Sequence, residues 1–186
     1  KISPAKAKLF RNKVTYMGHK LLIKNGGPCI TPLRQRTEAI IKMPIPDTKR
    51  KLKGFIGKVS YLSMYLPKLQ KLLRPLHAIA AKKAQFVWDH TTQEAYDHII
   101  QLLVKPPILA MPNSTGLFRL YCDTSKIGVG AALYQIQRGE ERLLGYFSKA
   151  LPRAATNYSI TELEFTGLYI SVHAFRYLLK SVNFEV

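Results

Sequence analysis

The sequence predicts an α/β protein (α+β overall), in which a small helical segment precedes a mixed sheet with one long packed helix. Two patterns lead to this fold class. Apolar residues follow a helical period through most of residues 31–104, and short runs of β-branched and aromatic residues separated by turns begin at Leu117. With 186 residues, of which 47% are hydrophobic, the chain is long enough to bury a core in one large or two small domains.

The first predicted element is a strand or hairpin over residues 14–23 (VTYMGHKLLI), a segment rich in β-branched and aromatic residues. The turn sequence NGG at 25–27 ends it. A helix is expected next, with Thr31 as its N-cap and Pro32 in its first position, where the missing N–H of proline does no harm. Pro44 ends this helix.

Further helical segments follow. Apolar positions over 48–66 form one stripe opposite a set of basic residues, and the helical pattern continues beyond it, with a kink or a division into two short helices expected at Pro75. Asp89 or Thr91 is expected to cap another helix, which runs to about Val104 and ends at a Lys-Pro-Pro sequence.

The second half predicts a β-meander and a long helix, beyond a domain boundary near residues 106–116. Residues 157–181 predict a helix of about six turns, capped by Ser159 or Asn157, and residues 182–186 begin one more strand. The three strand-like runs of the meander lie at 117–123, 128–135 and 141–149.

Positive charge is concentrated in the first half of the chain. Residues 1–88 hold 20 of the 29 Lys and Arg residues and two acids, Glu38 and Asp47, for a net charge of +18, whereas residues 89–186 hold nine basic and nine acidic residues. A surplus of this size on so few residues repels itself unless a polyanion is present, which favours nucleic acid as the partner. A membrane surface is less favoured, because none of the predicted helices combines a strongly basic face with Trp or Phe anchors.

Several features favour an intracellular protein, cytoplasmic or nuclear, over a secreted or membrane-spanning one. No stretch approaches the roughly 18 apolar residues that span a membrane. The basic N-terminal segment lacks the apolar core of a secretory signal. Cys29 and Cys122 have no metal-ligand spacing around them, and we expect two free thiols.

Two acids stand out by their positions. Asp123 ends an apolar run, where a lone carboxylate is costly unless it is paired, hydrogen-bonded or bound to a metal. Glu164 continues the helical stripe of Leu168 and Val172, which we expect to face the core, whereas Glu162 falls on the solvated side. A shared Mg²⁺ ion, which prefers oxygen ligands, would explain both positions. The alternative is that Glu164 is an N-terminal helix acid stabilised by the helix dipole.

Three later segments of the chain carry a family resemblance: YCDTSKIGVGAALYQ (121–135), LLGYFSKAL (143–151) and NYSITELEFTGLYISVHAFRYLL (157–179). Together they resemble the first half of the ribonuclease H domain of gypsy-type LTR retrotransposon reverse transcriptases. Earlier segments resemble the preceding parts of the same enzymes in order, so that the resemblance covers essentially the whole chain. It implies the end of the palm with its primer-grip strands over 1–30, thumb helices over 31–85, the connection over 86–112 and an incomplete ribonuclease-H-like domain over 113–186.

The resemblance also implies roles for particular residues. Asp123 and Glu164 match the first aspartate and the glutamate of the catalytic set, which binds Mg²⁺ or Mn²⁺ for two-metal hydrolysis of RNA in an RNA–DNA hybrid. The residues expected to bind nucleic acid are Met17, Gly18 and His19 of the primer grip, Gly57, Lys58 and Tyr61 of the thumb helix that lies along the minor groove, and Lys49, Arg50 and Lys53, which with Lys58 face phosphates.

Part of the family's catalytic set has no counterpart in this sequence. The other two ribonuclease carboxylates would follow Val186, and the polymerase aspartates would precede Lys1. We therefore expect a polyprotein fragment that grips a template–primer duplex in the parent enzyme, with the remaining parts of the polyprotein as its other partners. Alone it is expected neither to cleave RNA nor to extend a primer.

Two other function classes remain open. One is a non-catalytic nucleic-acid-binding module, decayed or co-opted, which retains the basic half without the chemistry. The other is a phosphotransferase of the actin-like superfamily, since DTSKIGVGA (123–131) also resembles a phosphate-facing strand turn. That second alternative needs another Asp-Gly-rich hairpin and an adenosine motif, and the sequence contains neither.

Overall fold

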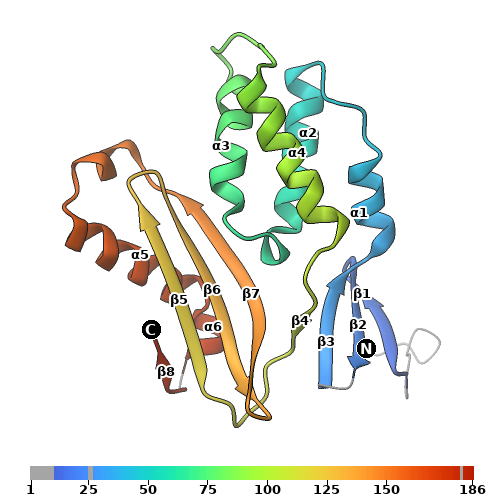
Figure 1. Cartoon of the computed structure of the whole chain (residues 1–186), viewed down its shortest axis with the longest axis vertical. Coiled ribbons are helices and arrows are strands. Elements are labelled where there is room, and N and C mark those ends of the chain that lie inside the picture. The colour runs from blue at the N-terminus through green and yellow to red at the C-terminus, as the bar shows by residue number, and fades with distance from the viewer. Residues whose placement is uncertain (1–10, 25–26, 181) are drawn as a thin grey trace, which may run out of the picture.

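The computed structural model describes residues 11–24, 27–180 and 182–186 (Figure 1). This part of the chain contains two four-stranded sheets and a bundle of helices, which confirms the predicted α/β class. Residues 1–10 of the predicted palm segment lie outside the described residues, as do Asn25 and Gly26 of the predicted turn.

The first sheet is antiparallel and has the strand order β1-β2-β3-β4. Met17 and Gly18 form the turn between β1 and β2 with φ values of 44° and 78°, so the predicted hairpin is confirmed. The last strand comes from far along the chain and pairs Ala110 with Cys29. The strands are β1 (Lys13–Tyr16), β2 (His19–Lys24), β3 (Gly27–Pro32) and β4 (Leu109–Ala110).

The helix predicted to start at Thr31 and Pro32 starts later, and that prediction is wrong. Both residues belong to β3, where Thr31 pairs with Lys20 and Pro32 with His19. Helix α1 (Arg34–Ile41) follows a residue whose side chain makes no capping hydrogen bond. Pairing with β2 has outweighed the local capping signal.

Three more helices complete the bundle: α2 (Lys49–Tyr61), α3 (Leu69–Ala80) and α4 (His90–Val104). Thr48 caps α2, and Asp89 caps α4 by accepting a hydrogen bond from the Thr92 N–H at 2.8 Å. Pro75 lies inside α3, which is not divided there. Helix α4 packs against α3 and α1. The bundle core is formed by buried residues that include Leu52, Phe55, Val59, Leu73, Ile99 and Leu103.

The second sheet has the order β7-β6-β5-β8 and confirms the predicted meander of three antiparallel strands. The fourth strand, β8 (Phe184–Glu185), pairs in parallel with β5, as the strand-like sequence at the chain end predicted. Two helices, α5 (Ile160–Ala174) and α6 (Arg176–Leu179), pack on one face and enclose a second core. The meander consists of β5 (Phe118–Ser125), β6 (Gly128–Gln137) and β7 (Glu140–Ala150), and a short 3₁₀ helix, η3 (Arg153–Asn157), leads to α5.

Helix α5 presents a different face to the sheet from the one predicted. Ser159 caps it in a reciprocal pair with Glu162, whose pKa is lowered by hydrogen bonds from the Ser159 backbone and side chain. Its buried positions are Leu163, Gly167 and Ser171, and Glu164 is exposed. The expectation that Glu164 faces the core is therefore wrong, whereas Glu162 is solvent-exposed as predicted.

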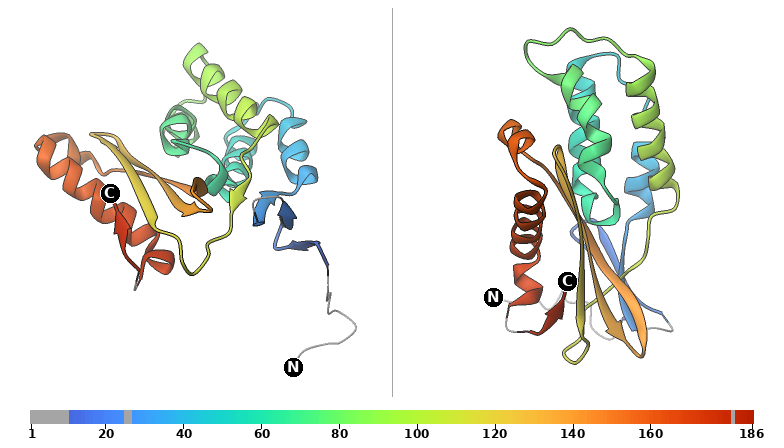
Figure 2. Two further views of the ribbon diagram at one scale, coloured as in Figure 1. Left: turned by 60° about the horizontal axis from the view of Figure 1, so that its bottom comes forward. Right: turned by 60° about the vertical axis from the view of Figure 1, so that its left-hand side comes forward.

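The helical bundle and the second sheet are in direct contact. Strand β7 touches α3 and the 3₁₀ turn η2 (Ser63–Tyr65), and the Gln70 N–H donates to Ser148 Oγ at 3.1 Å. The right-hand view of Figure 2 shows α5 on one side of the second sheet and the bundle toward the other. Within the described ranges, we find no helix with both the length and the apolar character needed to cross a membrane.

Candidate nucleic-acid interface and carboxylate site

The tip of the β1–β2 hairpin is fastened to the bundle by aromatic residues. The His19 ring stacks on Tyr61 with ring centroids 5.4 Å apart and planes 15° apart. His19 Nδ1 lies 2.8 Å from the Tyr65 hydroxyl, and the Tyr61 hydroxyl donates to the Met17 carbonyl oxygen. Burial and the nearby Arg36 charge lower the pKa of His19, and burial, with a smaller effect of Tyr61, raises that of Tyr65. Thus the predicted primer-grip residues Met17 and His19 meet the predicted thumb residue Tyr61.

Arg36 holds this arrangement from the side of α1. Its guanidinium carbon lies 4.7 Å from the centroid of the Tyr61 ring, within the range of a cation–π contact. The positive φ at Gly18 favours glycine in the turn, and a Cβ there would lie 2.5 Å from the same carbon, so a side chain would displace the Arg36 guanidinium. Arg36 and Tyr65 were not among the sequence-predicted site residues, because neither belongs to a local motif that marks them.

The outer face of α2 carries glycines that the chain itself does not require. A Cβ at Gly54 or Gly57 would have no atom within 4 Å, and both residues are exposed. A glycine inside a helix costs about 1 kcal/mol relative to alanine. Both lie at helical spacing between Arg50 and Tyr61, at offsets of 4 and 7 from the arginine and with the tyrosine at 11. Gly54 was not predicted, although this spacing was visible in the sequence.

The basic residues predicted to face phosphates divide into two groups. Arg50, Lys53 and Lys58 are exposed on α2. Lys49 is partly buried and donates instead to the carbonyl oxygens of Lys82, at 3.2 Å, and Ala84. Lys49 therefore ties the start of α2 to the segment after α3, and its charge is partly satisfied within the chain.

Asp123 is paired with a residue of the helical bundle. Its Oδ2 lies 2.7 Å from Lys68 Nζ, and both side chains are about two-thirds exposed (67% and 63%). Asp123 is opposite Gly130 in the β5–β6 register. Its neighbour Thr124 faces α5, where a Cβ at Gly167 would lie 1.7 Å from Thr124 Oγ1. Because successive side chains of a strand alternate, Asp123 points to the opposite face, toward α3.

Glu164 lies near the same end of the second sheet. It is one helical turn before Gly167, whose contact with Thr124 sets α5 against β5. The first turns of α5 lie at the carboxyl end of β5 (Figure 1). The two predicted metal ligands are thus both exposed and come from adjoining elements, but from opposite faces of the sheet.

A divalent cation fits part of this arrangement. Asp123 already holds a positive group, the Lys68 ammonium, at 2.7 Å. Mg²⁺ is commonly bound by one or two carboxylates together with water and substrate oxygens. In the described parts of the chain, however, no three His, Cys, Asp or Glu side chains gather as a metal-binding group. Asp123 therefore fits as one carboxylate ligand of such an ion, whereas the described structure does not bring Glu164 to the same face of the sheet, and the two residues do not make a complete two-ion centre.

A groove of about 610 Å³ lies between α3 and the edge of the second sheet that contains the β5–β6 turn and the end of β7. Asp123 lies on its wall and is the one acid among the described lining residues. Ser125, Gly128 and Gly130 bring the β5–β6 turn to it. Its basic lining residues are Lys68, Lys71 and Arg74 from the bundle and Lys126 and Arg153 from the sheet side. The groove therefore joins the basic half of the chain to the predicted catalytic aspartate.

Comparisons with known proteins agree with these observations. Residues 88–186 match the family described as the RNase H-like domain found in reverse transcriptase. The Gag-Pol polyprotein of gibbon ape leukemia virus is 32% identical over 158 residues, which cover 85% of this chain and 9% of the polyprotein. The Tf2-3 transposon polyprotein of Schizosaccharomyces pombe is 28% identical over 181 residues, 97% of this chain and 13% of the polyprotein. The chain thus spans about a tenth of the length of these relatives.

Solved structures show the same fold. A foamy viral protease–reverse transcriptase in complex with dsDNA has a TM-score of 0.78 at 15% identity, covering 97% of this chain and 37% of that one. A structure of the foamy viral protein with an RNA/DNA hybrid has a TM-score of 0.77 at 15% identity, covering 97% and 24%.

Proposed function

Because the chain belongs to the family described as the RNase H-like domain found in reverse transcriptase, we propose that it serves as the duplex-gripping and hybrid-cleaving part of a retroviral or retrotransposon polyprotein. The observation that carries this proposal is the outer face of α2. There the exposed Gly54 and Gly57 lie on the same side of the helix as Tyr61, which contacts the hairpin tip. The foamy viral structures of the same fold hold dsDNA and an RNA/DNA hybrid.

The α2 face suits the backbone and sugar edges of a duplex. Two exposed glycines let a partner approach the helix closely, and Arg50, Lys53 and Lys58 supply positive charge around them. Tyr61, 43% exposed, is held in place by His19 and Arg36 and offers a rigid flat edge. Nothing on this face is arranged to read individual bases, so binding depends on charge and shape rather than sequence.

The second part of the proposal concerns chemistry. Asp123 and Glu164 would hold Mg²⁺ or Mn²⁺, which when bound supplies a Lewis acid for hydrolysis of a phosphodiester. In this role the two carboxylates would bind and orient the ion, and further ligands would have to come from elsewhere in the parent protein. The chain alone is therefore expected to bind a hybrid without cleaving it. We also propose that the protein is intracellular, and the free thiols of Cys29 and Cys122 support this location.

Gly57→Ala tests the proposed interface directly. The substitution should stabilise the isolated chain by about 1 kcal/mol, because alanine favours the helix and has open space here. It should also weaken binding of an RNA–DNA hybrid roughly tenfold, since a methyl group would overpack the contact. Thermal unfolding and fluorescence anisotropy measure the two effects.

Gly54→Ala should behave in the same way, and Gln101→Ala, at an exposed position of another helix, α4, should change hybrid affinity much less. A Gly57→Ala chain that is stabilised and binds the hybrid as tightly as the wild type would rule out this face as the interface.

A non-catalytic nucleic-acid-binding module is the second candidate. The Lys68–Asp123 pair favours it, because it neutralises the carboxylate within the chain. Asp123→Asn in the complete parent protein separates the candidates. Loss of metal-dependent cleavage of the RNA strand with hybrid affinity kept supports the enzyme, and unchanged behaviour in both assays supports the module.

A further inference from the structure

The contact between Lys68 and Asp123 is built by more than two flexible side chains. Lys68 precedes α3 with φ of 51° and ψ of 28°, the left-handed region that non-glycine residues rarely occupy. A Cβ at Gly130, opposite Asp123 in the sheet, would lie 3.7 Å from Lys68 Cγ, so the stem of the lysine passes over a position without a side chain. The Gln70–Ser148 hydrogen bond fixes α3 against β7 two residues further on.

The ion pair between Lys68 and Asp123 is weak enough for either side chain to change its partner, because an exposed ion pair contributes little free energy. Both side chains are more than half exposed, and exposed ion pairs are readily replaced by other partners of the same charge. Lys68 opens into the same groove as Lys71 and Arg74, which would attract phosphates. A strand that enters this groove would bring several negative charges within reach of the Lys68 ammonium.

We propose that Lys68 is a counter-ion of Asp123 that keeps the carboxylate from binding a cation. When the phosphodiester backbone of a nucleic acid enters the groove, Lys68 pairs with a phosphate instead. Asp123 is then free to bind a divalent cation. This inference rests on the proposed function of the chain and adds its regulation: the aspartate becomes available for metal when the substrate class is present. Lys68 acts on Asp123 and is a positioning residue, since it is not placed against reacting atoms.

Mn²⁺ binding to the 186-residue chain tests the proposal without any activity assay. Mn²⁺ near Asp123 broadens the NMR signal of the Gly130 amide, and a titration of that broadening gives the affinity at this position. Without nucleic acid, Lys68→Ala should bind Mn²⁺ roughly 2- to 5-fold more tightly than the wild type, the range expected for one exposed ion pair. Lys71→Ala removes the same charge from the same groove but not from Asp123 and is the matched control, expected to bind as the wild type does. Asp123→Asn should abolish the broadening.

A short RNA–DNA hybrid supplies the second arm. When it is bound, the affinity ratio of Lys68→Ala to wild type should fall to about one, because the lysine no longer opposes the ion. Equal Mn²⁺ affinity of the two proteins without hybrid, absence of broadening in Lys68→Ala, or a ratio that the bound hybrid leaves unchanged would each overturn the counter-ion role of Lys68.

Hybrid binding itself is followed by fluorescence anisotropy. Failure of the hybrid to bind would overturn the proposed function, whereas the comparison of Lys68→Ala with wild type in its absence would still decide whether Lys68 opposes a cation at Asp123.

Discussion

The basic helical region and the second sheet differ in the size of the side chains that form the contacts between their elements. In the bundle, large side chains such as Phe55 and Tyr65 fill the interface between elements, and the hairpin is attached by hydrogen bonds and stacked rings. In the second sheet, α5 buries the small residues Gly167 and Ser171, and Gly167 lies directly against the Thr124 side chain of β5. Residues 1–88, which include most of the helical region, carry a net charge of +18, and residues 89–186, which include the whole second sheet, have none. Charge and rigid aromatic contacts thus lie together, apart from the acids of the sheet.

The largest expected effect comes from the charge difference between the regions. If about four basic residues of residues 1–88 contact phosphates, affinity for a hybrid should fall about 100-fold between roughly 50 and 200 mM salt. Lys53→Ala should lower the slope of log affinity against log salt by about one unit. Filter binding at several salt concentrations measures both.

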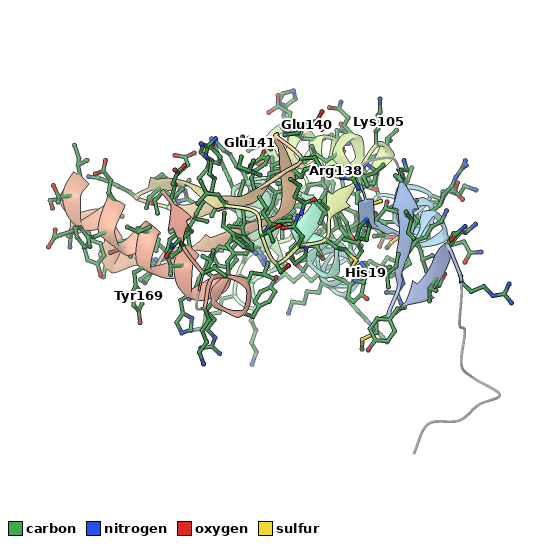
Figure 3. The ribbon with its side chains drawn as sticks, turned by 90° about the horizontal axis from the view of Figure 1, so that it is seen from below. His19, Lys105, Arg138, Glu140, Glu141 and Tyr169 are labelled. Carbon is green, nitrogen blue, oxygen red and sulfur yellow. The ribbon has the colours of Figure 1, made fainter. Side chains whose placement is uncertain are left out.

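Lys105→Ala is the matched control for that experiment. It removes the same charge at the end of α4, in the neutral half of the chain, and Lys105 lies on another side of the molecule from His19 (Figure 3). An affinity that does not depend on salt would show that residues 1–88 do not contact phosphates. The same conclusion would follow if the Lys53 and Lys105 variants lowered the slope of log affinity against log salt equally.

Gly167→Ala should have the next largest effect, confined to the second sheet. Its Cβ would collide with Thr124 Oγ1, and overpacking of this kind costs roughly 2–3 kcal/mol. Urea unfolding measures the loss, and hydrogen exchange should show it in β5 and α5 while α2 stays protected. Thr124→Ala in the same chain should recover part of the stability. An equal loss of hydrogen-exchange protection in the helical bundle and in the second sheet would mean that the two regions unfold together.

The smallest effect concerns pH and the hairpin. The pKa of His19 is lowered in the folded chain by burial and by Arg36, so the folded state prefers the neutral ring. The resulting stability is present above the unfolded pKa of about 6.5 and is lost as pH falls through the lower folded value. Thermal unfolding should therefore show a modest decrease from pH 7.5 to 5, which His19→Asn should reduce. An equal decrease in both proteins would assign it to other groups.

Local sequence patterns predicted much of the fold but failed where distant pairing decided the outcome. Asp89 and Ser159 were expected as caps and act as caps, because capping depends on residues within one turn. Thr31 and Pro32 carry an equally good helix-start signal, yet β2 recruits them into a strand. A capping signal is worth about 1 kcal/mol, which a buried strand position easily exceeds.

The position of Glu164 shows a second kind of failure. Counting large apolar residues on α5 selected Leu168 and Val172 as the core-facing stripe, and both do pack partly against the second core. The face that is closest to β5 instead uses Gly167 and Ser171, which carry little hydrophobicity. When a helix packs against a sheet through small residues, the pattern of large apolar residues in its sequence does not identify the buried face. The shared metal proposed for Asp123 and Glu164 was inferred from their sequence positions and from the resemblance, and neither gives the face of the sheet from which each side chain points. The Lys68–Asp123 pair had no local signal in the sequence.

The pairing of β4 with β3 has a consequence for how the chain is made. Cys29 and Ala110 are about 80 residues apart, so at roughly 5–20 residues per second the first sheet waits several seconds for its last strand to leave the ribosome. Until then the edge of β3 that faces β4 has no neighbouring strand, although β2 can already pair with the other edge, and helices α1–α4 have already been synthesised. The bundle is therefore available as a template on which the sheet closes, and β5 follows directly behind the closing strand.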